Sequence, residues 1–410
     1  MGNKMKTMSQ QVKEEIYLLL ETYRKISGKS VKEFTANNGK IGCSVTSYRR
    51  MGHQGVSDYQ YLDLLDFHQK TYCQTIPLNE QEQHTVRELH QAVVFYRYDT
   101  CIALIDELTA QLKSSQDIRV YLLWLFLEEL REYFESINYL DEEQIRAYLS
   151  IAHLYPAEIK DLIEFYCVYS AQKVSRLLMH EIYQNTEIGY SKFPPVVVHA
   201  MAYDFNYEEF ERGIIKSAGL KKQAMETDNH VLLFEYYDSM ITYYIQCEPD
   251  KVKDALISME ELINKPSFPN AKKIQFYNNA AHNYVFLNCF DQALYYFERY
   301  LHEASKLKLC LDGNIYTHIV FCKHMCDMPY DIDLEVLTTN KFYSLADYYL
   351  YEYFMEQSLL ETKDKKIRFI RNKIIKHFSK DDNFTKYMVR LELMRIIDQS
   401  KNLDLILQTM

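Results

Sequence analysis

A shortage of helix-breaking residues is the feature that most constrains the fold of this chain. Its 410 residues include only ten glycines and eight prolines. Apolar side chains recur at helical spacing along most of the length, without the alternation that is typical of strands. The pattern therefore predicts an all-α protein. A chain this long exceeds what one compact core normally supports, so we expect two domains or a repeat array.

The scarcity of glycine also argues against loops that cradle phosphate groups. The sequence has no glycine-rich nucleotide-binding motif and no H-E-x-x-H zinc motif. Carboxylate pairs such as Glu128-Glu129 and Glu208-Glu209 have no accompanying nucleophile or metal pattern, and we interpret them as surface charge. We expect a protein that is not an enzyme and that needs no cofactor.

Nine scattered cysteines form no small-domain disulfide framework, which favours free thiols in a reducing cytoplasm. Near the start of the chain the longest apolar run is 16–20, too short for a signal-peptide core, and no later run is long enough to cross a membrane. His318, Cys322 and Cys326 recur every four residues, with His324 nearby. Zinc could use them, but buried cysteine is common in helical cores, so we predict no metal site.

Charge is distributed unevenly along the chain. Residues 1–56 hold ten Lys and Arg against four Glu, a net charge of +6, and since the whole chain carries −10, the rest carries −16. A polyanion would be attracted to the first segment and repelled by most of the remainder. A molecule with two functional parts is therefore expected, and DNA is the first partner to consider.

Residues 29–69 have the pattern of a helix-turn-helix. We expect helices over 11–26, 31–37 and 45–51, and a further helix that begins at Asp58. Each predicted helix is bounded by residues that favour caps or left-handed turns. These bounding residues are Ser27, Gly28, Ser30, Asn38, Gly39 and Ser44.

Helix 45–51 is interpreted as the recognition helix. Val45 and Tyr48 would pack inward, so that the polar side chains can reach base edges in the major groove while nearby cations meet phosphates. The alternative is a short helical hairpin with a solvated basic face. The candidate DNA-binding residues are Lys29, Lys32, Lys40, Ser44, Thr46, Ser47, Arg49, Arg50 and His53.

Helical pairs follow from about residue 75 onward. Residues 75–77 (Thr-Ile-Pro) mark the expected linker, and proline-containing segments at 190–195 and 265–270 mark breaks inside the array. The sequence thus predicts a helix-turn-helix DNA-binding domain over 1–75 and a second, helical-repeat domain over 76–410.

The clearest repeat spans residues 274–304 and fits the tetratricopeptide pattern. Because one helix pair cannot bury its apolar face alone, neighbours should stack on it as a degenerate, right-handed solenoid, with 232–263 and 342–360 as candidates. The matching positions are Tyr277, Ala281, Tyr284, Ala293 and Phe297.

Four polar residues lie nearly opposite the packing side of the first helix of this repeat. Lys272, Gln275, Asn279 and Asn283 would face the concave surface of a solenoid. Their amides can both donate to and accept from an extended peptide backbone. A peptide-binding groove is one interpretation, and an ordinary solvated helix face is the other.

A second cluster of basic residues lies at 363–386. We interpret it as a solvated helix face, although it could add phosphate contacts or bind an acidic partner. Its cations are Lys363, Lys365, Lys366, Arg368, Arg371, Lys373, Lys376, Lys380 and Lys386.

The combination of a DNA-binding head and degenerate tetratricopeptide repeats resembles the peptide-sensing (RRNPP-type) regulators of Gram-positive bacteria and their phages, and within that family it is most similar to the arbitrium receptors. The segments that carry the resemblance are SYRRMGHQGVSDYQYLDLLDF at 47–67, AHNYVFLNCFDQALYYF at 281–297 and YMVRLELMRIIDQSKNLDLILQ at 387–408.

This resemblance implies a cytoplasmic homodimer whose two heads bind a double-stranded DNA operator. A short signalling peptide would bind the concave helices and change head spacing or dimerisation, as in quorum sensing or phage lysis-lysogeny communication. Lys272 and Asn283 match peptide-contacting positions of the family, whereas Tyr243 and Cys247 depart from it. The alternative is a Rap-type helical-repeat protein that binds and inhibits a response regulator or another protein.

Overall fold

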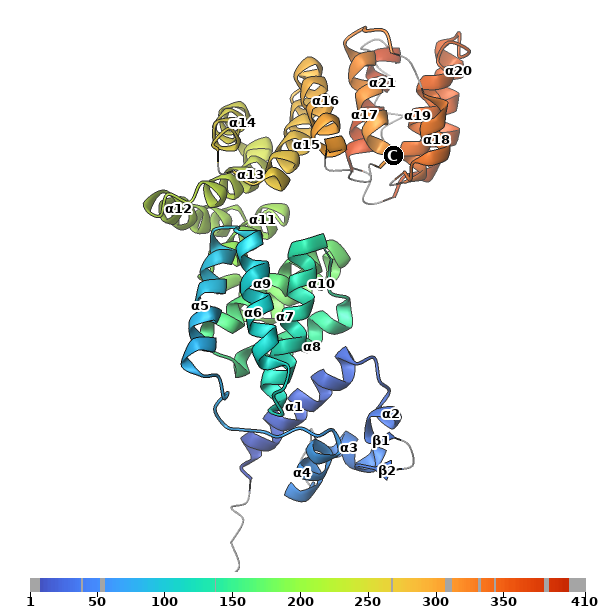
Figure 1. Cartoon of the computed structure of the whole chain (residues 1–410). Coiled ribbons are helices and arrows are strands. Elements are labelled where there is room, and N and C mark those ends of the chain that lie inside the picture. The colour runs from blue at the N-terminus through green and yellow to red at the C-terminus, as the bar shows by residue number, and fades with distance from the viewer. Residues whose placement is uncertain are drawn as a thin grey trace, which may run out of the picture. The chain divides into compact units, whose positions relative to one another are not determined.

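The computed structural model describes residues 8–37, 40–51, 56–136, 138–266, 268–306, 312–330, 333–342, 344–379 and 383–397. Over these ranges the chain is helical, apart from a short antiparallel ribbon of β1 (Ala36–Asn37) and β2 (Lys40–Ile41). The expectation of an all-α protein is confirmed in this coarse sense. The chain divides into two compact units, residues 1–262 and 263–410, whose helices are drawn in Figure 1.

The first helices begin close to the predicted residues. Ser9 caps α1, Ser30 forms a reciprocal capping box with Glu33, and α3 has the predicted bounds. The predicted helix 31–37 is too long, because Ala36 adopts an extended conformation and enters β1. The predicted turn at 38–39 lies outside the described residues. The helices are α1 (Gln10–Ile26), α2 (Val31–Thr35), α3 (Val45–Met51) and α4 (Asp58–Phe67).

The remaining helices of unit 1 pack mainly on their neighbours in sequence. The predicted break at 190–195 falls between helices, with Pro194 as the first residue of α11. The helices are α5 (Glu80–Val94), α6 (Tyr98–Leu112), α7 (Ile118–Ser136), α8 (Glu142–Ile151), η1 (Ala152–Leu154), α9 (Ala157–Val174), α10 (Arg176–Asn185), η2 (Glu187–Tyr190), α11 (Pro194–Asn206), α12 (Phe210–Glu226), α13 (His230–Cys247) and α14 (Asp250–Ile263).

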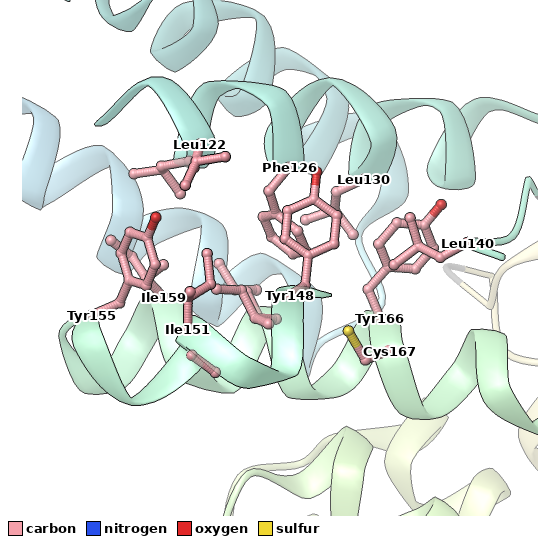
Figure 2. Packing of buried hydrophobic residues seen from close by; sticks show 14 of the residues in the cluster. Leu122, Phe126, Leu130, Leu140, Tyr148, Ile151, Tyr155, Ile159, Tyr166 and Cys167 are labelled. Carbon is pink, nitrogen blue, oxygen red and sulfur yellow. The ribbon is translucent and has the colours of Figure 1, made fainter. Parts of the chain in front are cut away.

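Large aromatic side chains fill the space between consecutive helices. Figure 2 shows Phe126 of α7, Tyr148 of α8 and Tyr166 of α9 side by side. The ring centroids of Phe126 and Tyr148 are 5.3 Å apart and those of Phe126 and Tyr166 are 6.2 Å apart. Such rings bury large apolar areas in specific geometries, which fixes the order in which the helices stack.

One type of helix ending recurs in both units. A residue with positive φ follows the helix, and the next backbone N–H donates back to the carbonyl five residues earlier, as in the Schellman motif. Glycine usually supplies the left-handed residue, yet only one of the seven described cases is a glycine. The left-handed residues are Gly28, Gln69, Tyr96, Glu208, Asp228, Asn288 and Asp327.

Helix α1 joins the N-terminal helices to the array. Its Ile16, Leu19 and Leu20 belong to the same continuous core as α7, α8 and α9. The Thr22 hydroxyl donates to the Ala147 carbonyl of α8 at 3.2 Å, and the Tyr23 ring meets the Tyr121 ring of α7 edge-on at 5.4 Å. Packing therefore continues across the predicted domain boundary at residue 75.

Hydrogen bonds from the start of α7 hold the segment that follows α4, and we call this set of contacts the Asp117 clasp. Asp117, at the start of α7, accepts the Cys73 N–H at 2.8 Å, and the Thr71 N–H donates to the Gln116 carbonyl at 2.7 Å. Arg119 donates to the carbonyls of Cys73 and Gln74. The residues just before the expected linker are thus attached to the start of α7, while a separate function for residues 1–75 stays a prediction.

Unit 2 is also built from neighbouring helices, with α15 on α16, α16 on α17 and α17 on α19. The predicted break at 265–270 lies beside the division between the units. The segment 342–360 supplies one helix rather than the pair expected of a repeat. The helices are α15 (Asn270–Phe286), α16 (Phe290–Lys306), α17 (Asn314–Met325), α18 (Leu334–Thr339), α19 (Leu345–Glu356), α20 (Lys363–Phe369), the π-helix η3 (Ile370–Ile374), η4 (Ile375–His377) and α21 (Asn383–Ile397).

No helix among the residues that the structure describes is both long and apolar enough to cross a membrane.

The Asp117 clasp predicts a large stability effect. In Asp117→Ala, the buried Arg119 side chain loses the carboxylate 3.9 Å away, and the Cys73 N–H loses its acceptor. We expect the free energy of unfolding, measured by urea titration of the full chain, to fall by about 3 kcal/mol. The control is Asp106→Ala, whose ion pair with Arg131 is exposed and should cost at most about 1 kcal/mol. Equal losses of unfolding free energy in the two variants would contradict a stabilising role of the Asp117 contacts.

Candidate functional site

Helix α3 is anchored on its inner side and open on its outer side. The Ser47 N–H donates to the Ser44 Oγ at 3.0 Å, which caps the helix. Tyr48 and Met51 are buried, whereas Thr46, Arg49 and Arg50 are exposed. Tyr48 thus packs inward and Thr46, Arg49 and Arg50 face outward as predicted, whereas Val45 and Ser47 are half-buried.

Two hydrogen bonds fix the inner side of α3. The Tyr48 hydroxyl donates to Glu21 Oε2 of α1 at 2.7 Å, and the Tyr61 hydroxyl of α4 donates to the Met51 carbonyl at 2.5 Å. Burial opposes ionisation of Glu21, but hydrogen bonds from Arg24 and Tyr48 outweigh it and lower the pKa of this carboxyl. Glu21 therefore stays charged and links α1 to α3.

Within the helices α1 to α4, which we call the head, ion pairs occupy cations that would otherwise be available to a binding partner. Arg24 pairs with Glu21 at 2.6 Å and Lys13 pairs with Asp58 at 2.6 Å. By contrast, Lys32, Lys40, Arg49 and Arg50 are exposed and form no ion pair among the described residues. The positive charge open to a partner is therefore concentrated on α2, β2 and α3.

The other predicted DNA contacts differ in accessibility. Ser44 is exposed, but its hydroxyl serves the cap and donates to the Ser47 Oγ at 2.9 Å. Ser47 is half-buried and also accepts from Gln60 at 3.4 Å, and Lys29 is half-buried. His53 lies outside the described residues. Thr46, Lys32, Lys40, Arg49 and Arg50 are thus the best-presented members of the set.

His68 packs against α2, behind the exposed basic residues of this part of the chain. Its ring stacks on Phe34 of α2, with centroids 4.1 Å apart, and its Nε2 lies 3.0 Å from the Phe34 carbonyl oxygen, where the neutral imidazole donates. Burial, with smaller contributions from Lys29 and Lys70, outweighs the hydrogen bond to Phe34 and lowers the pKa of His68 to about 4. The neutral ring therefore holds α2 in place at neutral pH.

The predicted packing side of α15 is buried. Tyr277, Ala281 and Tyr284 are all covered, the Tyr284 ring stacks on Tyr296 of α16 at 5.4 Å, and the Arg299 guanidinium donates to the Tyr277 hydroxyl at 3.0 Å. The pair α15 and α16 therefore buries the residues that the repeat pattern selects.

The predicted peptide contacts share the opposite side of α15, and all four are half-buried. Lys272 donates to the Gln275 side-chain oxygen at 3.0 Å, and Lys272, Gln275 and Asn279 take part in further interactions within the chain. A ligand at Asn279 would therefore have to compete with existing interactions as well as with water.

Sequence reasoning missed a polar pocket of about 550 Å³ in unit 2. At its base the buried Glu392 of α21 accepts from the Tyr353 hydroxyl at 2.7 Å and from the Gln357 amide at 3.2 Å, and His324 Nε2 lies 2.9 Å away. These residues come from three helices far apart in sequence, so no local pattern could reveal them. The lining residues include His324, Met328, Tyr330, Gln357, Lys363, Lys366, Glu392 and Arg395.

Of the positions considered for zinc, His318 and Cys322 face the core, whereas His324 and Cys326 are half-buried. His318 is buried against His282 and Phe384, with ring centroids 5.0 and 4.7 Å away, and burial holds the pKa of His318 well below its usual value. Cys322 is also buried. In the described ranges no group of three or more His, Cys, Asp or Glu residues could hold a metal ion.

No protein-family model matches the chain, and no curated protein matches it.

The lowered pKa of His68 predicts that the folded state of the N-terminal helices loses stability in acid. The pKa of about 4 in the folded chain is below the value of about 6.5 for an unfolded histidine, so the unfolded state binds more protons between these values. This stabilising contribution is complete above about pH 6.5 and is lost as the pH falls towards 4.

We therefore expect the slope of unfolding free energy against pH in this window to decrease in His68→Phe by up to about 1.4 kcal/mol per pH unit. Urea titrations of both chains at several pH values measure it. An identical pH dependence of the two chains would contradict the assignment.

Proposed function

We propose that this chain is a DNA-binding transcriptional regulator with a helix-turn-helix head. The observation that carries the proposal is the outer face of α3, where Thr46, Arg49 and Arg50 are exposed and the two arginines have no ion pair within the described ranges. Arginine can donate two hydrogen bonds to guanine, and threonine can contact bases through its hydroxyl or methyl group. Lys32 and Lys40 on neighbouring elements would meet the phosphate backbone.

The proposal gives the helical remainder a regulatory role in the cytoplasm. The burial of Tyr277, Ala281, Tyr284, Ala293 and Phe297 supports a degenerate tetratricopeptide solenoid over 76–410, and so does the resemblance to peptide-sensing regulators. The amides of Asn279 and Asn283, together with Gln275 and Lys272, would bind a short signalling peptide in extended form.

Regulation requires two conformations that differ in affinity for the peptide. A peptide can change DNA binding only if it binds one arrangement of the chain better than the other. The contacts of α1 with α7 and α8 provide a physical route, because a shift of those helices must move the head or break the Thr22 hydrogen bond. A homodimer, as in the resembled family, would place two heads on two half-sites of an operator.

The recognition helix is tested by Arg49→Ala combined with Arg50→Ala. Both side chains are exposed, so we expect unchanged circular dichroism and a loss of specific DNA affinity of at least about 30-fold, from about 1 to 3 kcal/mol for each of two lost base contacts. The measurement is fluorescence anisotropy on genomic fragments that the full chain retains.

Lys113→Ala with Lys192→Ala is the matched control, because it removes the same charge from exposed positions outside the head. The assignment fails if the control loses as much affinity as the arginine variant. If the full chain does not bind DNA even at low salt, the result would favour the Rap-type alternative instead.

The peptide surface is tested by Asn279→Ala combined with Asn283→Ala. Removing two amides that each exchange hydrogen bonds with a peptide backbone should weaken binding by about tenfold or more. The measurement is calorimetric titration with peptides that the full chain retains from conditioned medium of the producing cells. Gln111→Ala with Gln223→Ala, exposed amides on α6 and α12, is the control. Unchanged affinity in the asparagine variant would reject this surface.

A further inference from the structure

Unit 2 carries a basic surface that the proposed head does not use. Residues 363–377, which span α20, η3 and η4, contain seven Lys and Arg against one Asp, a net charge of +6. The N-terminal segment needs 56 residues to reach the same net charge. Cationic charge is therefore denser here than in the head, although the whole chain is acidic.

Most of these cations are open to a partner. Lys365 pairs with Glu361 at 3.6 Å and Lys373 pairs with Glu352 at 3.2 Å. The other five form no ion pair with any residue that the structure describes, and all of them except the half-buried Lys366 are exposed. These five are Lys363, Lys366, Arg368, Arg371 and Lys376.

The backbone under the basic surface is held by buried apolar side chains. Phe369, Ile370 and Ile374 are buried, the last two completely, and the Phe369 ring meets the Tyr353 ring of α19 at 5.7 Å. Ile370–Ile374 form a π-helical turn, a feature often found at functional sites. The cations thus project from a backbone that core packing fixes.

The surface fits phosphates better than it fits a folded protein. The described part of 363–377 exposes no large apolar side chain, whereas the binding energy of protein interfaces comes mainly from buried aromatic and apolar anchors. Contacts to a nucleic-acid backbone need only cations, because affinity comes from releasing counterions. Charge without apolar anchors therefore favours a polyanion.

We propose that the basic surface at 363–377 binds the phosphate backbone of duplex DNA, without reading sequence. This inference rests on the proposed DNA-binding function and adds a second contact region to it. Arg368, Arg371 and Lys376 supply the phosphate contacts tested below.

The test measures affinity of the full chain for a sequence-random duplex as a function of salt. In the triple variant Arg368→Gln, Arg371→Gln and Lys376→Gln, we expect about tenfold weaker binding near 0.1 M salt. The slope of log affinity against log salt should become shallower by about 2 to 3, since each phosphate contact contributes about 0.9. The charge-preserving variant Arg368→Lys with Arg371→Lys should retain the wild-type slope.

Lys113→Gln, Lys192→Gln and Lys253→Gln form the matched control, because these residues are exposed in unit 1 and their loss changes the net charge equally. If the basic-surface triple and this control give the same slope while Arg49→Ala with Arg50→Ala weakens binding, the inference is wrong and the proposed function stands. That result would leave an acidic protein as the partner class. If the wild-type chain does not bind duplex DNA even at low salt, both the inference and the proposed function are wrong.

Discussion

Helix α1 must bury two sides, and the arrangement of the first unit depends on where each side goes. One side meets α3 and α4, where Glu21 holds Tyr48, and the other meets α7 and α8, where Thr22 and Tyr23 make their contacts. Because both sides belong to one continuous core, the N-terminal helices cannot move freely against the helices next to them. The contacts of Asp117 and Arg119 with Cys73 and Gln74 add a second connection, between residues that are 44 to 46 positions apart in the sequence. A change in the packing of α7 or α8 would therefore displace α3 or break its contacts with α1, as the proposed regulation of DNA binding requires.

The chain has a net charge of −10, yet two regions of it are strongly basic. In the N-terminal helices, the carboxylates of Glu21 and Asp58 pair with Arg24 and Lys13 of α1, so the unpaired positive charge of the described residues lies on α3 and the elements beside it. The basic surface at 363–377 repeats this principle, since only part of its charge is paired locally. Long-range repulsion from the acidic remainder would oppose non-specific binding and leave these two surfaces as the places where a polyanion is attracted.

Local patterns in the sequence predicted the elements that depend on local forces. The bounds of α3, the helix cap at Ser30 and the helix end at Gly28 follow from caps and turn residues within a few positions. Contacts between distant segments could not be predicted in this way. The attachment of Cys73 to Asp117 and the burial of Glu392 among side chains from other helices join residues that share no local pattern. For the same reason the candidate DNA-binding and peptide-binding residues could be predicted as exposed or half-buried faces, but their existing partners could not.

The proposed function requires that the chain binds DNA through α3 and selects particular sequences. Sequencing the genomic fragments that the purified full chain retains, at moderate salt and in parallel with the Arg49→Ala, Arg50→Ala chain, tests this claim most directly. We expect the wild-type chain to enrich a small set of fragments that share one sequence pattern, and the variant to enrich none of them, because base contacts carry the sequence information. Retained fragments that match the bulk genome, or the same enrichment in both chains, would contradict the proposed function.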